Sequence, residues 1–427
     1  MNISEYLEIK RDIVEDELQN IINGLRITRL DKVSSNRDIH LYKTKYLQKI
    51  LDEYGDLNSS EMYYTTLYYN QWMSKIIETL HKLYLKRNTI NENVVKLKQL
   101  VLPEQRSPEW YDIRKNLLTA SSLADALGKG HFQTRDDLLI SKTCKVPKPF
   151  LMNHIMQWGV KYEPVATEFY EKLNNLRIVE FGLIPHPELK EFGASPDGIC
   201  DVGSPNGYEG RMLEIKCPPR RAFTEEVPIH YWMQMQGQLE VCDLEECDFL
   251  QVKLEEYEDV GEYEKDLYYT DKLVHGKTKE GLPKGLVIAY RLKDPNSDKY
   301  DIEYKYSPWG ESLDEVGNWK DATIKELNET YSQSDKIFSL YEVKWWKIIR
   351  YECTLVRRDQ EWWSSTVPEI IKFWKEVVHY REVGNEEVQK KIDGRKRKRN
   401  TKPKKVVTIP DVSDVYQMLD TDEEDTK

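Results

Sequence analysis

The sequence lacks several features that define large classes of proteins. Its six cysteines form no Cys-x-x-Cys pair, so neither a cysteine-rich zinc site nor an iron–sulfur cluster is expected. No apolar run approaches the roughly 20 residues that a membrane-spanning helix needs. The first residues are acidic and lack the apolar core of a signal peptide. We therefore expect a soluble intracellular protein with reduced thiols and no membrane contact.

The sequence also lacks an overall positive charge, which would be the simplest sign of a nucleic-acid partner. The net charge is −11, yet residues 390–405 hold ten Lys or Arg against one Asp, and residues 411–427 hold seven Asp or Glu against one Lys. An acidic protein can bind DNA where its site is locally basic or holds metal ions. The charge therefore does not exclude a DNA partner.

The length of 427 residues exceeds that of a usual single domain. Residues 1–102 carry apolar residues at helical spacing and little glycine, so we expect a helical N-terminal extension there. Residues 103–380 mix helical and strand patterns and are expected to form the main domain. Residues 381–427, with the basic run 390–405 and the acidic end 411–427, are expected to be a disordered tail.

Within the main domain, helical patterns precede a series of strand patterns. Helices are expected at 107–127, 150–173, 229–241 and 340–380. Strands are expected at 177–186, 191–200, 211–218, 248–257, 285–292 and 299–306. This order predicts an α+β fold with an α/β core, in which a mixed β-sheet is flanked by helices.

Two acidic positions beside one lysine carry the main chemical signal. Asp197 lies in a Ser-Pro-Asp-Gly turn, while Glu214 and Lys216 alternate along a short apolar strand. Side chains two positions apart on a strand share a face, so Glu214 and Lys216 point the same way. If the two segments pair as a hairpin, Asp197 approaches Glu214 across it. The same residues also fit an ordinary turn and a solvated strand face.

Two carboxylates that approach each other repel unless a cation lies between them. Oxygen ligands suit Mg²⁺ or Mn²⁺, and the backbone carbonyl of Ile215 could supply a further oxygen. A metal there would polarise a phosphoryl oxygen and lower the pKa of its water, with Lys216 beside the attacking water. The pattern therefore indicates metal-assisted hydrolysis of a phosphodiester.

Neighbouring segments place further polar residues near this strand. Glu163 lies on a helix ahead of the first strand, from which a carboxylate can reach the same metal. Gln234 and Gln236 lie two positions apart on a helix, so they face different ways and only one is expected to enter the site.

An anion site is indicated in the segment WYDIRKNLLTASSLADALG. Arg114 precedes Thr119-Ala120-Ser121, which opens a helix. A helix N-terminus beside a guanidinium and a hydroxyl suits a terminal phosphate. The alternative is a helix-capping Ser121 and an unrelated surface arginine.

Taken in order, five stretches resemble the YqaJ-like viral recombinases and the phage lambda-type exonucleases, within the PD-(D/E)xK nuclease superfamily. The stretches are PEWYDIRKNLLTASSLADALG, WGVKYEPVATEFYE, GASPDGIC, LEIKCP and HYWMQMQGQLEV. They span about 107–241, and their order and spacing are those of the family. The resemblance implies a restriction-endonuclease-like mixed sheet flanked by helices.

The resemblance also implies a role for each matching residue. Asp197 and Glu214 correspond to the family's metal-binding carboxylates, and Lys216 corresponds to its catalytic lysine. Glu163 corresponds to the helix glutamate near the metals.

Three further residues follow from the same resemblance. Gln234, rather than Gln236, corresponds to the glutamine that positions the nucleophilic water. Arg114 and Ser121 correspond to the pair that holds the 5′-phosphate of a DNA end.

The family's members typically degrade linear double-stranded DNA from 5′ to 3′ with Mg²⁺, and they leave a 3′ tail for a partner annealing protein. The resemblance therefore implies a metal-dependent DNA exonuclease for viral recombination, repair or replication, in the host cytoplasm (a viral factory) or the nucleus. Some members assemble into a ring. The residues before 103 and after 257 are additions to the compact members and could block such a ring, so a homo-oligomer is possible but is not implied. Two alternatives remain: a weakly catalytic scaffold that binds DNA ends, and a structure-specific endonuclease.

The basic run has two functional interpretations of its own. Lys396, Arg397, Lys398 and Arg399 fit a nuclear-localisation signal or a tether that adds salt-dependent affinity for DNA. They also fit a run of charges that is simply solvated.

Overall fold

The computed structural model describes residues 67, 89–103, 107–144, 153–204, 208–224, 226–296 and 300–400, and for 396–400 it describes the backbone alone. Most of the expected N-terminal extension lies outside these residues. Its last part, 89–98, is helical, and Val94 and Leu97 pack into the main core. Among the residues described, no helix combines the length and the apolar character needed to cross a membrane.

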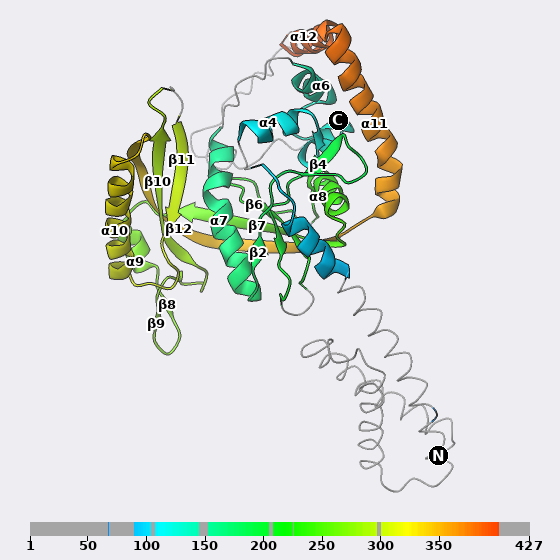
Figure 1. The fold of residues 1–427 in the computed structure, drawn as a ribbon. Helices are drawn as coiled ribbons and strands as arrows, with labels where there is room; N and C mark the ends of the chain where they lie inside the picture. The colour runs from blue at the N-terminus through cyan, green and yellow to red at the C-terminus, as the bar shows by residue number, and fades with distance from the viewer. Residues whose placement is uncertain are drawn as a thin grey trace, which may run out of the picture.

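A seven-stranded mixed sheet forms the centre of the fold (Figure 1). Within it β6 and β7 are parallel, and the other neighbouring strands are antiparallel. The strands in order across the sheet are β11 (Tyr300–Tyr306), β10 (Lys284–Lys293), β12 (Ile337–Arg357), β7 (Glu246–Glu256), β6 (Met212–Lys216), β5 (Gly198–Cys200) and β2 (Ile178–Val179).

Two smaller sheets flank the main one. In the first, β1 (Leu118–Thr119) is parallel to β4 (Phe192–Ala194), which is antiparallel to β3 (Ile184–Pro185). In the second, β8 (Tyr268–Tyr269) pairs with β9 (Leu273–Val274). The β1–β4 pairing matters for the site, because it joins the segment after Arg114 to the segment that leads into the Ser-Pro-Asp-Gly turn.

Helices cover both faces of the main sheet, with α10 on the outer side of β10 and β12 and α11 running along the opposite end of the molecule (Figure 1). The helices are α4 (Pro108–Lys115), the 3₁₀ turn η2 (Ala120–Ser122), α5 (Leu123–Ala126), α6 (Arg135–Thr143), α7 (His154–Asn174), α8 (Ile229–Cys242), α9 (Val260–Lys265), α10 (Leu313–Ser332), α11 (Gln360–Val383) and α12 (Glu386–Asn400).

The alternation of side chains along β6 separates two apolar clusters. Leu213 and Ile215 pack in one cluster with α7, while Met212 packs in the other with α8. Glu214 points to the α8 side, where glutamines of that helix bind its carboxylate. The predicted fold class, a mixed sheet flanked by helices in an α+β arrangement, is confirmed.

The expectation of a helix across 340–380 is wrong in its first half. Residues Ile337–Arg357 form β12, which pairs with β10 on one edge and β7 on the other. Trp346 and Ile348 are fully buried on the α7 side. Aromatic and β-branched residues suit a strand that packs between two others, and this preference prevails over the spacing that suggested a helix. The helix begins only at Gln360.

The expected disordered tail is partly wrong as well, because α12 is helical and packed. Val388 and Ile392, four positions apart, are buried in the main core. On the same helix, Lys391 binds Asp136 of α6 at 3.1 Å, and Arg395 binds the same carboxylate. The composition of 381–400 is mostly charged, so it did not indicate this helix. The helix packs through the buried Val388 and Ile392 and through the ion pairs with Asp136. The acidic end of the tail is not among the described residues.

Two glycines inside helices offer a matched test of the packing. A Cβ at Gly237 of α8 would lie 2.8 Å from Phe192 and 3.2 Å from Ala120, whereas a Cβ at Gly159 of α7 would meet nothing within 4 Å. We expect Gly237→Ala to lower the free energy of unfolding by about 1–3 kcal/mol through overpacking. Gly159→Ala should raise it by about 0.5–1 kcal/mol through helix propensity. Urea denaturation measures both, and equal effects would contradict the close packing of η2 on α8.

Candidate active site

The structure brings Asp197 and Glu214 together at the junction of β4, β5 and β6. Asp197 follows β4, and its Oδ2 accepts a hydrogen bond from the backbone N–H of Ile215 at 2.7 Å. β5 pairs antiparallel with β6, which is the hairpin that the sequence predicts. Asp197 is partly buried, and the side chain of Glu214 is 0% exposed.

The buried carboxylate of Glu214 accepts hydrogen bonds from three side chains. Lys216, two positions along β6, donates to Oε1. Gln234 of α8 donates to Oε1 at 2.7 Å, and Gln238 donates to Oε2 at 2.8 Å. The Nζ of Lys216 also donates to the backbone carbonyl of Ile215 at 3.0 Å, so this carbonyl lies at the site. Burial of a carboxylate requires such partners, and here they come from one strand and one helix.

The electrostatics of this cluster are those of a crowded anionic site. Burial, and then the charge of Glu214, raise the pKa of Asp197 well above its ordinary value. Burial acts to lower the pKa of Lys216, but Glu214 and Asp197 outweigh it, so the pKa of Lys216 is raised. Lys216 is therefore an ammonium at neutral pH, and it acts here as a donor and a positive charge.

Glu163 lies on α7, near enough for its charge to raise the pKa of Asp197 further. The residues that the structure describes contain no group of three or more His, Cys, Asp or Glu close enough together to hold a metal ion. The structure thus brings Asp197 and Glu214 together, with Glu163 as a further negative charge acting on Asp197.

The donor set still fits a hard divalent cation. Two carboxylates repel at one site, and burial leaves little solvent to screen them. Ser195 Oγ and Gln238 Oε1 are buried beside the cluster without a hydrogen-bond partner among the described residues. Carboxylate, carbonyl and amide oxygens are the ligands that Mg²⁺ and Mn²⁺ prefer. Asp197, Glu214 and the carbonyl of Ile215 are therefore the residues that could hold such an ion.

Of the three glutamines of α8, two face Glu214 and one faces away from it. Gln234 and Gln238 lie four positions apart, so they share the face that meets Glu214. Gln236 lies on another face, where it donates to the carbonyl of Arg357 at 2.8 Å and accepts from the N–H of Asp359 at 2.7 Å. Sequence reasoning selected Gln234 over Gln236 but missed Gln238, which the i, i+4 spacing would have revealed.

The residues of the expected anion site, Arg114 and Ser121, also lie close together, at the start of η2. Arg114 Nη2 donates to Ser121 Oγ at 3.5 Å, and Thr119 Oγ1 lies 3.1 Å from the same oxygen. The guanidinium of Arg114 lies over the ring of Trp110, 5.0 Å from its centroid, and burial lowers its pKa. η2 packs directly on α8, the helix of the site glutamines, so the two clusters share one scaffold.

A cationic and aromatic group beside Lys216 was not predicted. The ring of Tyr231 lies 5.1 Å from the Nζ of Lys216 and 5.8 Å from the guanidinium of Arg221. His230 stacks on His131 at 5.2 Å, and burial and the nearby cations lower its pKa to about 4. The signals in the sequence were the Arg-Arg pair after LEIKCPP and the His-Tyr pair that opens the glutamine helix.

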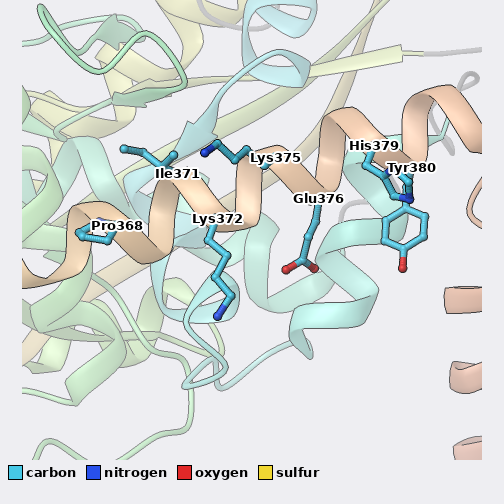
Figure 2. A pocket seen from close by; sticks show the side chains of 7 residues that line it. All are labelled: Pro368, Ile371, Lys372, Lys375, Glu376, His379 and Tyr380. Atoms are coloured by element: carbon cyan, nitrogen blue, oxygen red, sulfur yellow. The ribbon is translucent and has the colours of Figure 1, made fainter.

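The basic residues of the tail lie far along the chain from these clusters. Lys396, Arg397, Lys398 and Arg399 belong to α12, and the structure describes only their backbone. A shallow hollow of about 390 Å³ lies along α11 (Figure 2). It contains none of the candidate site residues, because its lining is Pro368, Ile371, Lys372, Lys375, Glu376, His379 and Tyr380.

The fold and the cluster together define a mixed α+β protein with two carboxylates and a lysine at the junction of three strands. Residues 109–245 match the family model of the YqaJ-like viral recombinase domain. This match confirms, over that range, the resemblance predicted from the sequence. It covers every candidate site residue except the basic run on α12.

Two other comparisons also found similar proteins. An uncharacterized protein of Acanthamoeba polyphaga mimivirus is 31% identical over 320 residues, which cover 70% of this chain and 56% of that protein. The chain thus spans little more than half the length of this relative. Among solved structures, an alkaline exonuclease from Laribacter hongkongensis is similar at 20% identity (TM-score 0.37; 66% of this chain and 99% of that chain covered). A phage-related exonuclease from Haemophilus somnus is similar at 13% identity (TM-score 0.32; 64% and 96% covered).

The raised pKa of Asp197 predicts how the metal-free protein responds to pH. As the pH rises above 3.8, the unfolded chain releases this proton before the folded protein does, so the stability falls with pH. Asp197→Asn removes this effect and keeps an oxygen for the N–H of Ile215. In chelator we expect the variant to melt roughly 2–5 °C above the wild type at pH 8. The gap should shrink at pH 5, and a gap that does not vary with pH would contradict the burial of the charge.

Proposed function

We propose that this protein is a metal-dependent DNA exonuclease that hydrolyses phosphodiester bonds of linear double-stranded DNA, from 5′ to 3′. The observation that carries the proposal is the buried contact of Glu214 with Lys216, beside Asp197, inside a YqaJ-like viral recombinase domain. A scaffold that only binds DNA would gain nothing from two repelling carboxylates next to a lysine. The relative from a virus is consistent with a viral role, and the similar structures carry exonuclease names.

The proposal assigns a divalent cation, Mg²⁺ or Mn²⁺, to the oxygens of the cluster. Asp197, Glu214 and the carbonyl of Ile215 would hold it, with Glu163 as a further carboxylate on α7. When bound, the ion supplies Lewis-acid polarisation of a phosphoryl oxygen and a lowered pKa of water. The charge of Glu214 that, after burial, raises the pKa of Asp197 would be offset there.

The remaining residues bind and orient the reacting groups. Lys216 keeps its proton at neutral pH, so its Nζ donates to a phosphate oxygen and offsets the negative charge that develops during hydrolysis. Gln234 holds the attacking water from the α8 side with its amide. Gln238 keeps the Glu214 carboxylate in place through its bond to Oε2.

Recognition of the DNA end is assigned to Arg114 and Ser121. A guanidinium and a hydroxyl at hydrogen-bond range of each other form a fork that fits a terminal 5′-phosphate. The packing of η2, which carries Ser121, on α8, which carries Gln234 and Gln238, supports a DNA-end site next to the glutamines. This shared scaffold supports an exonuclease over an endonuclease, because an endonuclease has no end to hold.

The proposal extends to the organisation of the chain and its partners. Residues 103–380 form the nuclease domain, 1–102 a helical extension, and the basic run a DNA tether or nuclear signal. The substrate is a double-stranded DNA end, and the product, a 3′ single strand, suits a single-strand annealing or recombinase protein in viral recombination, repair or replication. A homo-oligomer, and a site of action in the host cytoplasm or nucleus, are consistent with this role.

Digestion of DNA tests the proposal directly. We expect the wild type with Mg²⁺ to degrade linear duplex and to leave a closed circle of the same sequence intact. Glu214→Gln should reduce the rate by at least about 100-fold, because it removes a metal ligand and the partner of Lys216. Asp248→Asn is the matched control, since Asp248 is also a buried carboxylate of the sheet but binds Arg211 and Tyr170 instead.

The outcomes separate the candidate functions. Cutting of the circle would indicate an endonuclease, and tight binding of ends without cutting would indicate a scaffold. Equal loss of activity in Glu214→Gln and Asp248→Asn would contradict a specific role for Glu214. Digestion products labelled at either end report the direction.

Metal binding is open to a test that needs no activity. We expect 5 mM Mg²⁺ to raise the melting temperature of the wild type by roughly 2–4 °C over NaCl of equal ionic strength, by mass action. The shift should disappear in Asp197→Asn, whose amide is a poorer ligand. Scanning fluorimetry measures it, and a shift of equal size in both proteins would place the ion elsewhere.

A further inference from the structure

The segment 114–118 runs from Arg114, near the end of α4, to Leu118, at the start of β1, and leads directly to Ser121. Within it, Asn116 donates a hydrogen bond back to the carbonyl of Asp112 in α4, and Leu117 and Leu118 are buried. Three of its backbone carbonyls are bound by two basic side chains from elsewhere in the chain, Lys142 and Arg381. These two cations are absent from the motifs that the sequence resemblance singles out.

The first cation is Lys142, at the end of α6. Its side chain is buried, and its Nζ donates to the carbonyl of Arg114 at 2.7 Å and to the carbonyl of Leu117 at 2.6 Å. The amino group of Lys142 therefore bridges the carbonyls of Arg114 and Leu117 and keeps these two residues at a fixed distance.

The second cation is Arg381, near the end of α11 and outside the matched range 109–245. Its Nη2 donates to the carbonyl of Lys115 at 2.8 Å, and its Nη1 donates to Oδ1 of Asn116 at 3.1 Å. Its Nε donates to the carbonyl of Lys142 at 3.0 Å. Four consecutive residues of the segment are thus held by one lysine and one arginine.

The charges of this arrangement are unbalanced. Arg114, Lys142 and Arg381 lie close enough for the two arginines to lower the pKa of Lys142, after burial, to about 7. Among the residues that the structure describes, no carboxylate lies close enough to shift the pKa of any of the three. Two arginines and a partly protonated lysine without a carboxylate create a site that favours an anion.

We infer that Lys142 and Arg381 are positioning residues, which hold the Arg114–Ser121 segment in the shape that binds a terminal 5′-phosphate and add positive potential behind it. This inference rests on the proposed end-binding role of Arg114 and Ser121. It makes α11 part of end recognition, although α11 lies outside the recombinase-like domain. A phosphate that binds Arg114 would offset the positive charge of this group.

Binding of DNA ends in chelator tests the inference without hydrolysis. The probes are two 3′-labelled duplex oligonucleotides, one with 5′-phosphate and one with 5′-hydroxyl ends, and fluorescence anisotropy measures their affinities. We expect the wild type to prefer the phosphate by about tenfold, as a charge-assisted contact would give. Lys142→Met should bring the preference close to one while the affinity for the hydroxyl duplex changes less than about twofold. Arg381→Gln, at a partly exposed position, should reduce the preference in the same way.

Lys284 provides the matched control for a purely structural role. It too is a buried lysine whose Nζ donates to two backbone carbonyls, those of Tyr263 and Asp266, but it lies at the start of β10. Lys284→Met should leave the preference for phosphate intact.

Three outcomes would overturn the inference: a wild type without preference, a Lys142→Met variant that keeps it, or an equal loss in Lys284→Met. Digestion of linear DNA is measured separately. An active nuclease without the preference overturns this inference alone, and an inactive protein whose preference depends on Lys142 overturns the nuclease alone.

Discussion

The burial of Glu214 between β6 and α8 is the constraint on which the rest of the structure depends. A buried carboxylate is stable only with donors around it, and Lys216, Gln234 and Gln238 supply them. Two donors come from α8, so the position of Glu214 fixes how α8 lies on the sheet. Gly237, between them, then lets η2 and β4 approach closely. The burial of Glu214 therefore also helps to place η2, which carries Ser121, one of the two residues proposed to bind a DNA end.

The part of the chain beyond 245 supports this arrangement from the other side. Lys161 of α7 is buried and bonds to Glu256 of β7 at 2.7 Å and Glu342 of β12 at 2.5 Å. Tyr306 of β11 donates to the carbonyl of Lys161 at 2.6 Å. These contacts hold the turn of α7 that bears Glu163. Together with Arg381, they make the later strands and helices a supporting layer for both clusters rather than a separate module.

The sequence predicts those parts of the site that local geometry decides. Two-residue alternation brings Glu214 and Lys216 to one face, and the turn with its following hairpin brings Asp197 to them. It does not predict Lys142 or Arg381, because their role is to bind backbone carbonyls, and any residue type can offer a carbonyl. It also misreads β12, since its neighbours β7 and β10 are chosen by long-range pairing, which no local pattern reports.

The place of β12 in the sheet has a consequence for how the chain reaches its native state. β12 lies between β7 and β10, although both precede it in the sequence. During synthesis, β7 and β10 therefore emerge with open edges that face each other across a gap, and only the arrival of 337–357 closes it. Such non-local closure is slow, and open strand edges attract other chains. β12 thus completes the main sheet, and a nascent chain that stalls before it exposes two unpaired strand edges that are prone to aggregation.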